Sequence, residues 1–410
     1  MPAGTGDLLM QRIELLAEIS ESPDGLTRRF ATPEHKLANA TVAGWMQQCG
    51  MQTREDHIGN IIGRYEGASP NSPAIMIGSH LDTVVMAGKY DGMLGVLSGI
   101  SCVEYLHAND RRLPFAVEVI GFADEEGVRY QSTYLGSKAL TGELAVQELQ
   151  RTDADGITMS EALQAFGKNP DKLDSAQRSA DEIRAYLELH IEQGPVLEHE
   201  NLPVGVVTGI AGATRLMIEM HGVAGHAGTV PMSMRQDALA ASAEAIIGIE
   251  NLCSANAALV GTVGQIRCEP GATNVIPGFA AFTIDVRSAN NRQREQAVDS
   301  ITKLITESAA KRRVECVIEI LHNESSVDCA PQVVAALGKA IESMGSRSVQ
   351  LASGAGHDAA AMASLTQVGM LFVRCEGGIS HNPAESVTMD DAAAGAEALL
   401  RAVLEISKAE

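Results

Sequence analysis

The chain has 410 residues, of which 45% are hydrophobic and 20% are charged. This length exceeds what one hydrophobic core usually organises, so the sequence predicts two domains. The formal net charge of −21 opposes binding to phosphate backbones and anionic membranes, because like charges repel. We therefore expect neither nucleic acid nor a membrane as a partner.

The amino terminus and the cysteines indicate the compartment. Residues 1–20 are typical of an amphipathic helix and lack the basic and apolar segments of a secretory signal. No run approaches the roughly 18 apolar residues of a membrane span. The seven cysteines are scattered and form no C-x-x-C pair, which argues against a disulfide framework and a thiolate zinc site. These features predict a cytoplasmic protein.

Short apolar runs alternate with helical patterns in the first half of the chain. Strands are predicted over Ala74–Ser79, Val117–Ala123 and Ala185–Ile191, with a helix over Gly92–Ala108. This alternation is typical of an α/β layered sheet. In such sheets, functional side chains gather where strands end.

Between about Gly212 and Val327 the order of the predicted elements changes. It becomes strand Thr214–Gly222, helix Arg235–Glu250, strand Leu259–Glu269, strand Gly278–Ser288, helix Asn291–Ala310 and strand Val314–Leu321. The order βαββαβ is that of a ferredoxin-like domain. A helix over Pro331–Met344, a strand over Met370–Cys375 and a helix from Met389 then resume the first pattern. We expect a mixed-sheet catalytic domain of residues 1–212 and 327–410, interrupted by a domain of residues 213–326.

Two potential ligands follow the first predicted strand. His80 and Asp82 are two residues apart, so their side chains can lie on one side of an extended chain. His80 can then bind a metal while Asp82 orients its ring, since a ligating imidazole usually donates its second N–H to a carboxylate or carbonyl group. In isolation, the pair is more typical of a loop histidine beside a turn aspartate.

The acidic candidates also have ordinary structural interpretations. Asp91 precedes a helical run, where aspartate often caps a helix. Residues 123–127, Ala-Asp-Glu-Glu-Gly, follow the next strand. An exposed acidic turn explains them, whereas their burial together requires neutralising cations.

Histidines at strand ends complete a possible metal site. His190 and His381 each lie at the end of a predicted strand or just after one, and either alone is more often a structural residue. The joint pattern is more informative, because His80, Asp91, an acid of residues 124–126, His190 and His381 all fall at strand ends. Imidazole and carboxylate ligands without thiolates favour Zn²⁺, Mn²⁺ or Co²⁺.

Nine segments follow one another along nearly the whole chain. They are GSHLDTV (78–84), GKYDGMLGV (88–96), ADEEG (123–127), ELHIEQGPVLE (188–198), GHAGTVPM (225–232), TNVIPG (273–278), DVR (285–287), SGAGHDA (353–359) and GGISHNPAE (377–385). Together they resemble the dinuclear aminoacylase/carboxypeptidase-like (M20) metallohydrolases. The segment with His190 and Gln193 is similar to the hydantoinase/carbamoylase branch, which includes N-carbamoyl-L-amino-acid hydrolases, allantoate amidohydrolases and β-ureidopropionase-like enzymes.

The resemblance implies a set of site residues. It implies two divalent metal ions, held by His80, Asp91, Glu126, His190 and His381, with Asp91 bridging; which terminal ligand serves which ion stays open. The implied catalytic residues are Glu125 as general base, Asp82 beside the ligand His80, and His226 as a donor to the carbonyl oxygen. The implied substrate-binding residues are Gln193, His226, Asn274, Arg287 and His357, the last without a definite role.

The implied reaction is hydrolysis of a ureido C–N bond. Metal coordination lowers the pKa of water from about 15.7 toward 7, and Glu125 takes its proton. The period-2 pattern places Phe282, Ile284 and Val286 on one face and Arg287 on the other, where its guanidinium can bind a substrate carboxylate. We expect an N-carbamoyl-L-amino acid as substrate, releasing amino acid, ammonia and carbon dioxide. Allantoate is the alternative, followed by N-carbamoyl-β-alanine and by acylated amino acids or dipeptides.

The resemblance also implies a homodimer. The inserted domain would serve as a lid and dimerisation domain that supplies His226 across the interface. A serine hydrolase is disfavoured, because the sequence lacks a G-x-S-x-G elbow. A binding protein without activity is disfavoured as well, because every expected ligand and the base Glu125 are present.

Overall fold

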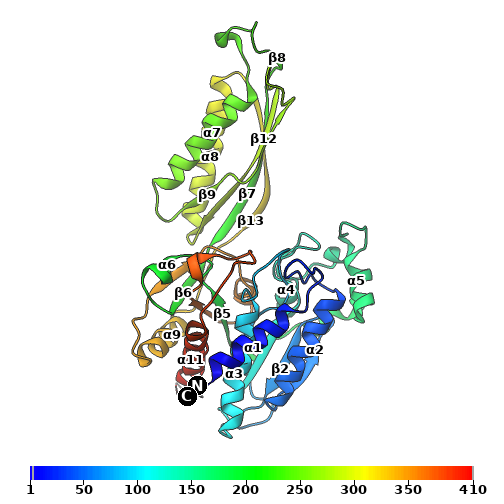
Figure 1. Ribbon diagram of the computed structural model, residues 1–410, viewed down its shortest axis with the longest axis vertical. Coiled ribbons are helices and arrows are strands. Elements are labelled where there is room, and N and C mark those ends of the chain that lie inside the picture. The colour runs from blue at the N-terminus through cyan, green and yellow to red at the C-terminus, as the bar shows by residue number, and fades with distance from the viewer. Residues whose placement is uncertain (2–3, 409–410) are drawn as a thin grey trace. The chain divides into compact units, whose positions relative to one another are not determined.

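The computed structural model describes Met1 and residues 4–408. The chain divides into two compact units (Figure 1). Unit 1 consists of Met1–Thr208, Cys329–Leu351 and His357–Glu410, and unit 2 of Gly209–Asp328 and Ala352–Gly356. Among the described helices, none combines the length and the apolar character needed to cross a membrane.

A mixed sheet of nine strands lies mainly in unit 1 and includes residues 209–210, 327–328 and 352–353 of unit 2. Its order is β1-β2-β4-β3-β5-β16-β6-β14, with β15 paired to β6. The strands are β1 (Gln52–Glu55), β2 (Ile61–Tyr65), β3 (Ala74–His80), β4 (Ala116–Phe122), β5 (Ile183–Ile191), β6 (Val204–Ile210), β14 (Val327–Asp328), β15 (Gln350–Ser353) and β16 (Val368–Val373). The central strands β4, β3, β5 and β16 are parallel. Their carboxyl ends therefore lie at one edge of the sheet.

The side-chain pattern of β5 shows how the sheet is covered. Leu187, Leu189 and Ile191 belong to the main hydrophobic core, whereas Glu188 and His190 alternate with them and point to the other face. Helices α1 (Thr5–Ala17), α3 (Met93–Ala108), α9 (Pro331–Ser343) and α11 (Met389–Ile406) pack against one another and contribute to this core (Figure 1). The polar residues of β5 therefore lie outside this core, on the opposite face of the sheet.

Other helices complete unit 1. Helix α2 (Pro33–Gln48) packs on β1 and β2. Helix α10 (Asp358–Met362) contacts β5, β16 and α4 (Leu135–Thr141). A smaller hydrophobic cluster includes residues of α4 and of α5 (Met159–Phe166), and the short helix α6 (Val196–His199) follows β5.

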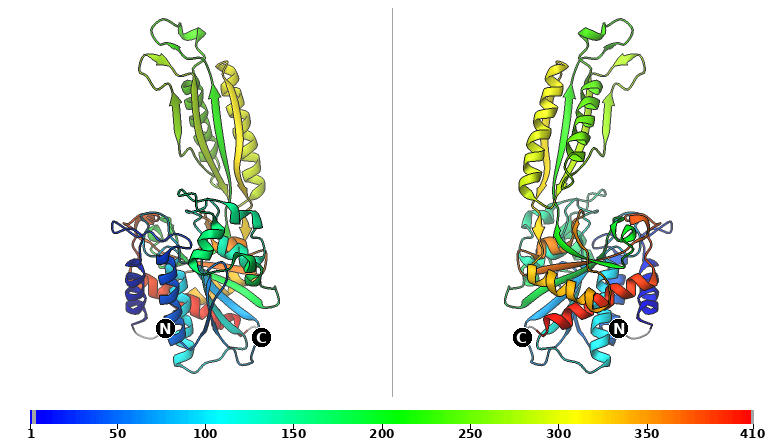
Figure 2. Two further views of the ribbon diagram at one scale, coloured as in Figure 1. Left: turned by 90° about the vertical axis from the view of Figure 1, so that its right-hand side faces the viewer. Right: turned by 90° about the vertical axis from the view of Figure 1, so that its left-hand side faces the viewer.

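Unit 2 has an antiparallel sheet in the order β10-β12-β7-β13, with β9 paired to β12. Its elements are β7 (Gly212–His221), β8 (Gly225–His226), α7 (Ala238–Ser254), β9 (Val260–Thr262), β10 (Ile266–Glu269), β11 (Val275–Ile276), β12 (Phe279–Ser288), α8 (Asn291–Lys311) and β13 (Glu315–Glu324). Helices α7 and α8 lie side by side over one face of this sheet (Figure 2). They bury Ile218, Phe282 and Ile284 beneath them.

Most predicted elements match the structure, and two differ in detail. The single predicted strand Leu259–Glu269 is divided into β9 and β10, with glycines at 261 and 264, and glycine inside a strand weakens it. The predicted helix Arg235–Glu250 begins only at Ala238, because the Asp237 side chain caps it by accepting the Ala240 N–H. The roles of residues 213–326 as a lid and dimerisation domain stay predictions.

Candidate metal centre

The carboxyl edge of the parallel strands gathers the five expected ligands. His80 is the last residue of β3, and His190 precedes the last residue of β5. Glu126 follows β4, His381 follows β16, and Asp91 lies just before α3. The structure brings the side chains of these five residues together in unit 1.

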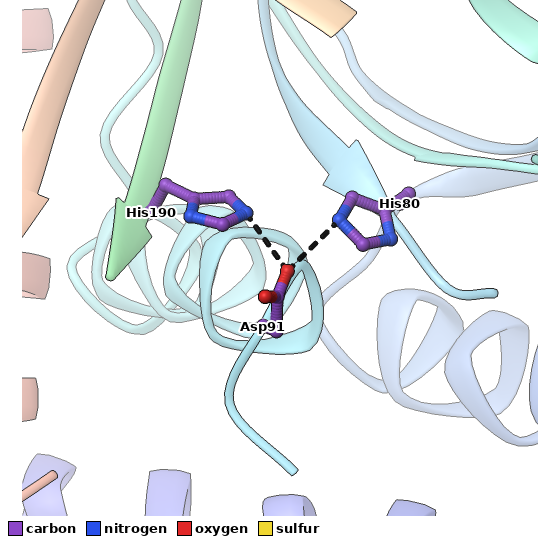
Figure 3. A group of neighbouring side chains, drawn as sticks. All are labelled: His80, Asp91 and His190. Carbon is purple, nitrogen blue, oxygen red and sulfur yellow. Dashed lines mark ion pairs between the residues drawn. The ribbon is translucent and has the colours of Figure 1, made fainter. Parts of the chain in front are cut away.

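The Asp91 carboxylate contacts three of the other ligands, and Figure 3 shows it between His80 and His190. Its Oδ1 lies 3.3 Å from His80 Nε2 and 3.1 Å from His190 Nε2. Its Oδ2 lies 3.4 Å from His381 Nε2, which is 3.2 Å from Glu126 Oε1. One carboxylate therefore faces two separate sets of donors, His80 with His190 and Glu126 with His381.

A glycine makes the close approach of Asp91 possible. Gly92, not Asp91, is the N-cap of α3, and its φ is +74°. A Cβ at Gly92 would lie 2.6 Å from Cε1, Nδ1 and the carbonyl oxygen of His80. The helix-cap interpretation of Asp91 is thus wrong, and the turn needs glycine both for its backbone angle and for space.

Asp82 contacts both His80 and the acidic segment. Its Oδ1 lies 3.5 Å from His80 Nδ1, which is 2.9 Å from the Asp82 carbonyl oxygen. The same carboxylate accepts the backbone N–H groups of Glu125 at 2.9 Å and Glu126 at 3.2 Å. It therefore holds the acidic segment beside the histidine whose ring it contacts.

The acidic segment is not an exposed turn. Asp124 and Glu125 are buried, and Glu125 and Glu126 each offer an oxygen to a group with His80 in which the ligand atoms lie within 4.8 Å of one another. The two glutamates lie in a bend and not in an extended strand, so neighbouring side chains reach the same region. Burial, together with the nearby Glu126 charge, raises the pKa of Glu125 well above its usual value.

The charges of the cluster suit metal cations. Burial opposes the charged imidazolium of His80 and His190, but contacts with Asp82 or Asp91 outweigh burial and raise the pKa of both rings. Burial likewise opposes the Asp91 anion, yet His190 and His80 hold its pKa well below the usual value. The Asp91 carboxylate is thus stabilised as an anion by its two histidine neighbours, and nitrogen and oxygen donors of this kind fit Zn²⁺, Mn²⁺ or Co²⁺.

Gln193 adjoins the cluster in an unusual backbone conformation. Its φ is +56°, which costs free energy in a non-glycine residue and is often found at functional sites. Its Nε2 donates to Asp91 Oδ2 at 2.8 Å and lies 3.1 Å from Ser380 Oγ. Its Oε1 is buried and has no hydrogen-bond partner among the described residues.

His357 lies against a proposed ligand. Its ring is 1% exposed, and its centroid is 4.5 Å from that of His190. Burial, reinforced by His190, holds the pKa of His357 well below its usual value. A neutral ring packed on His190 supports that histidine from the side.

The remaining predicted residues belong to unit 2. His226 and Asn274 are both exposed, and the structure brings them together, because β8 pairs with β11 and the Ala227 N–H donates to the Asn274 carbonyl oxygen. Arg287 is on β12, away from the core face as predicted. Its guanidinium donates to both carboxylate oxygens of Asp285, at 2.7 and 3.0 Å, and to the Gly354 carbonyl oxygen at 2.8 Å.

Two neighbours of Asp91 were missed from the sequence. Ser380 Oγ is 2.7 Å from Asp91 Oδ2, and the buried Glu385 accepts the N–H groups of Tyr90 and Asp91. Both residues lie in the GGISHNPAE segment that also carries His381. The available signal was therefore the segment as a whole.

Known proteins resemble this chain over most of its length. Residues 76–405 match the Peptidase family M20/M25/M40. The chain is 43% identical over 425 residues to an allantoate deiminase of Arabidopsis thaliana, covering 96% of this chain and 81% of the relative. It is 40% identical over 406 residues to an N-carbamoyl-L-amino acid amidohydrolase of Geobacillus stearothermophilus, covering 99% of each.

Solved structures share the fold. A hydantoinase/carbamoylase family amidase from Burkholderia multivorans has a TM-score of 0.91 at 31% identity, covering 97% of each chain. AtUAH in complex with (S)-hydroxyglycine has a TM-score of 0.83 at 33% identity, covering 98% of each chain. These two structures confirm the predicted α/β fold class. Aminopeptidase PepT from Bacillus cereus, at 17% identity and a TM-score of 0.68, is alike in fold alone.

Proposed function

Because the chain belongs to the Peptidase family M20/M25/M40, we propose that it hydrolyses a C–N bond of a small ureido acid at a two-metal centre. The observation that carries this proposal is the Asp91 carboxylate, which two sets of donors share. The relatives named for allantoate and for N-carbamoyl-L-amino acids both act on ureido acids, which favours that substrate class over dipeptides.

The two donor sets suggest how the ions are held. His80 and His190 would hold one ion, Glu126 and His381 would hold the other, and the Asp91 carboxylate would be shared by both. When bound, the ions lower the pKa of water and polarise the scissile carbonyl group. Zn²⁺ is the first choice for these ligands, with Mn²⁺ and Co²⁺ as alternatives.

Glu125 is the proposed general base. It is buried beside Glu126, which raises its pKa and brings a carboxylate closer to the range in which it can both accept and return a proton. It takes a proton from the attacking water, a C–O bond forms at the carbamoyl carbon, and the proton passes to the leaving nitrogen as the C–N bond breaks. The products are the free amine and carbamic acid, which decomposes to ammonia and carbon dioxide.

The other predicted residues bind the substrate in this proposal. His226 donates to the carbonyl oxygen, where negative charge develops, and Gln193 and Asn274 hydrogen-bond the ureido group. Arg287, whose guanidinium is oriented by Asp285 and Gly354, binds the substrate carboxylate. His357 supports His190 from the side, as its ring packing suggests.

Two substrates remain candidates. An N-carbamoyl-L-amino acid is favoured by the match to the Geobacillus enzyme over 99% of both chains. Allantoate is favoured by the higher identity, 43%, to the Arabidopsis allantoate deiminase. Both molecules carry a carboxylate and a terminal ureido group, so the residues above serve either one.

A substrate panel tests the function and separates the candidates. We expect the metal-loaded protein to hydrolyse allantoate or an N-carbamoyl-L-amino acid with kcat/KM at least about 100-fold above that for dipeptides and N-acyl amino acids, because a site that hydrogen-bonds a polar group strongly rejects analogues lacking it. N-carbamoyl-β-alanine keeps the ureido group and the carboxylate, and it is included as a third ureido acid. Ammonia release measures the ureido substrates and amine release the others. Preference for a dipeptide, or no turnover of any ureido acid, would refute the proposal.

We further propose a homodimer in which His226 completes the partner's site. Glu125→Gln and His226→Ala homodimers are each expected to be nearly inactive. When the two are unfolded and refolded together, a heterodimer contains one site with both lesions and one intact site, so roughly a quarter of all sites recover under random pairing. Activity of the mixture, measured beside each variant refolded alone, tests this arrangement.

The control uses another exposed histidine of unit 2. His221 lies at the end of β7, and a His221→Ala variant is expected to keep activity near wild type. If His226 serves its own subunit, every site in the mixture carries a lesion. Continued inactivity after verified heterodimer formation would therefore rule out the shared site while leaving the metal mechanism intact.

A further inference from the structure

Glu385 is a buried acid beside the metal centre that is not among the proposed ligands. Its side chain is 3% exposed. Oε1 accepts the backbone N–H of Tyr90 at 2.8 Å and that of Asp91 at 3.1 Å. Burying a carboxylate is costly unless hydrogen bonds compensate, so these two contacts fix the main chain that carries Asp91.

Ser380 connects Glu385 to the side chain of Asp91. Its Oγ lies 3.1 Å from Glu385 Oε2 and 2.7 Å from Asp91 Oδ2. The main chain of Asp91 is thus held by Glu385 directly. The Ser380 hydroxyl has one proton, so it donates to one of the two carboxylates at a time, and its shorter contact is with Asp91.

The loop before Asp91 is shaped to fit Glu385. A Cβ at Gly88 would lie 2.2 Å from Glu385 Cδ and 2.3 Å from its Oε1. Under 3 Å something must move, and the atoms to be moved already hold Tyr90 and Asp91. Gly88 therefore allows the loop to lie directly on the carboxylate.

We propose that Glu385, acting partly through Ser380, is a positioning residue that fixes the bridging orientation of Asp91. In that orientation Oδ1 faces His80 and His190, while Oδ2 faces His381. The inference rests on the proposed function, because the two donor sets are the two proposed metal shells. Its consequence is that loss of Glu385 weakens ion binding although every ligand remains.

Paired substitutions test the role. Glu385→Ala removes all the acceptors, whereas Glu385→Gln keeps an oxygen for the Tyr90 and Asp91 N–H groups and an amide that can donate to Ser380. We expect Glu385→Ala to weaken Zn²⁺ binding by about 10–100-fold, the usual effect of losing a residue that orients a ligand. Glu385→Gln should stay within about threefold of wild type. Dissociation constants come from competition between metal-free protein and a chromophoric chelator.

Two further variants sharpen the test. Glu376→Gln changes an exposed acid directly before the GGISHNPAE segment and should bind Zn²⁺ like wild type. Ser380→Ala removes only the link to the Asp91 side chain and should weaken binding severalfold. Because Ser380 and Glu385 act on one residue, the double variant Glu385→Ala/Ser380→Ala should lose less than the product of the two single effects.

The outcomes separate the role of Glu385 from a general effect on folding. If Glu385→Ala binds Zn²⁺ like wild type while its metal-free melting temperature falls, Glu385 is merely structural and the proposal is overturned. If Glu385→Ala fails to fold, Ser380→Ala decides, and unchanged Zn²⁺ binding there overturns it. The substrate panel is a separate measurement: a protein that binds Zn²⁺ as expected but hydrolyses no ureido acid refutes the function and leaves the positioning role standing.

Discussion

Removal of divalent metal ions is expected to abolish hydrolysis, and addition of Zn²⁺, Mn²⁺ or Co²⁺ to restore it. The residues around Asp91 form groups that could hold a metal ion, and without a metal the pKa of water returns from about 7 to about 15.7. The measurement is kcat after dialysis against a chelator and after readdition of each metal, with the metal content determined in parallel. Full turnover by a demonstrably metal-free preparation would contradict the metal mechanism.

Ion binding should also be visible without substrate. A ligand that binds only the folded state stabilises it, by about 2.7 kcal/mol at a concentration 100 times its dissociation constant, so Zn²⁺ should raise the melting temperature. His80→Ala should reduce this rise, because it removes a ligand of the shared Asp91 cluster. The apparent affinity should fall at lower pH, since the raised pKa values of His80 and His190 make protons compete with the metal.

Glu125→Gln is expected to lower kcat by about 10²–10⁴-fold while the metal content stays at the wild-type level. The amide keeps the shape of the side chain but cannot accept a proton, and general base catalysis contributes rates of this size. Steady-state kinetics and metal analysis of the same preparation measure both effects.

The neighbouring acid is a matched control for Glu125. Glu126 lies beside His381 at 3.2 Å, so Glu126→Gln should lose metal as well as activity. If Glu125→Gln turns over like wild type, the base is a different residue. If instead Glu125→Gln loses metal and Glu126→Gln keeps it, the two proposed roles are exchanged.

The sequence was most informative where one periodicity extended over a whole element. The period-2 pattern separates Phe282, Ile284 and Val286 from Arg287, and the core of unit 2 confirms it. The strand over Leu259–Glu269 was misjudged, since glycines at 261 and 264 permit a break that the hydrophobic pattern does not reveal.

The candidate site was predictable as a list of residues but not as an arrangement. Strand ends predicted His80, His190 and His381, because parallel strands finish at one edge. The turn at Gly92 determines which donors lie near each oxygen of Asp91. The hydrophobic pattern of the sequence does not predict the geometry of this turn. Glu385 was missed for a related reason. Its closest partners are the backbone N–H groups of Tyr90 and Asp91, and a sequence pattern does not show which backbone groups a side chain will bind.

The position of β16 in the large sheet has a consequence for biosynthesis. Strand β16 lies between β5 and β6, although those two strands follow each other along the chain. A ribosome that has made residues 1–367 has therefore produced both neighbours of β16 but not the strand that pairs with them, and His381 is still to come. Strand β16 can join the centre of this sheet only near the end of translation. Until then the unpaired edges of β5 and β6 can form hydrogen bonds with other chains or with the wrong strands.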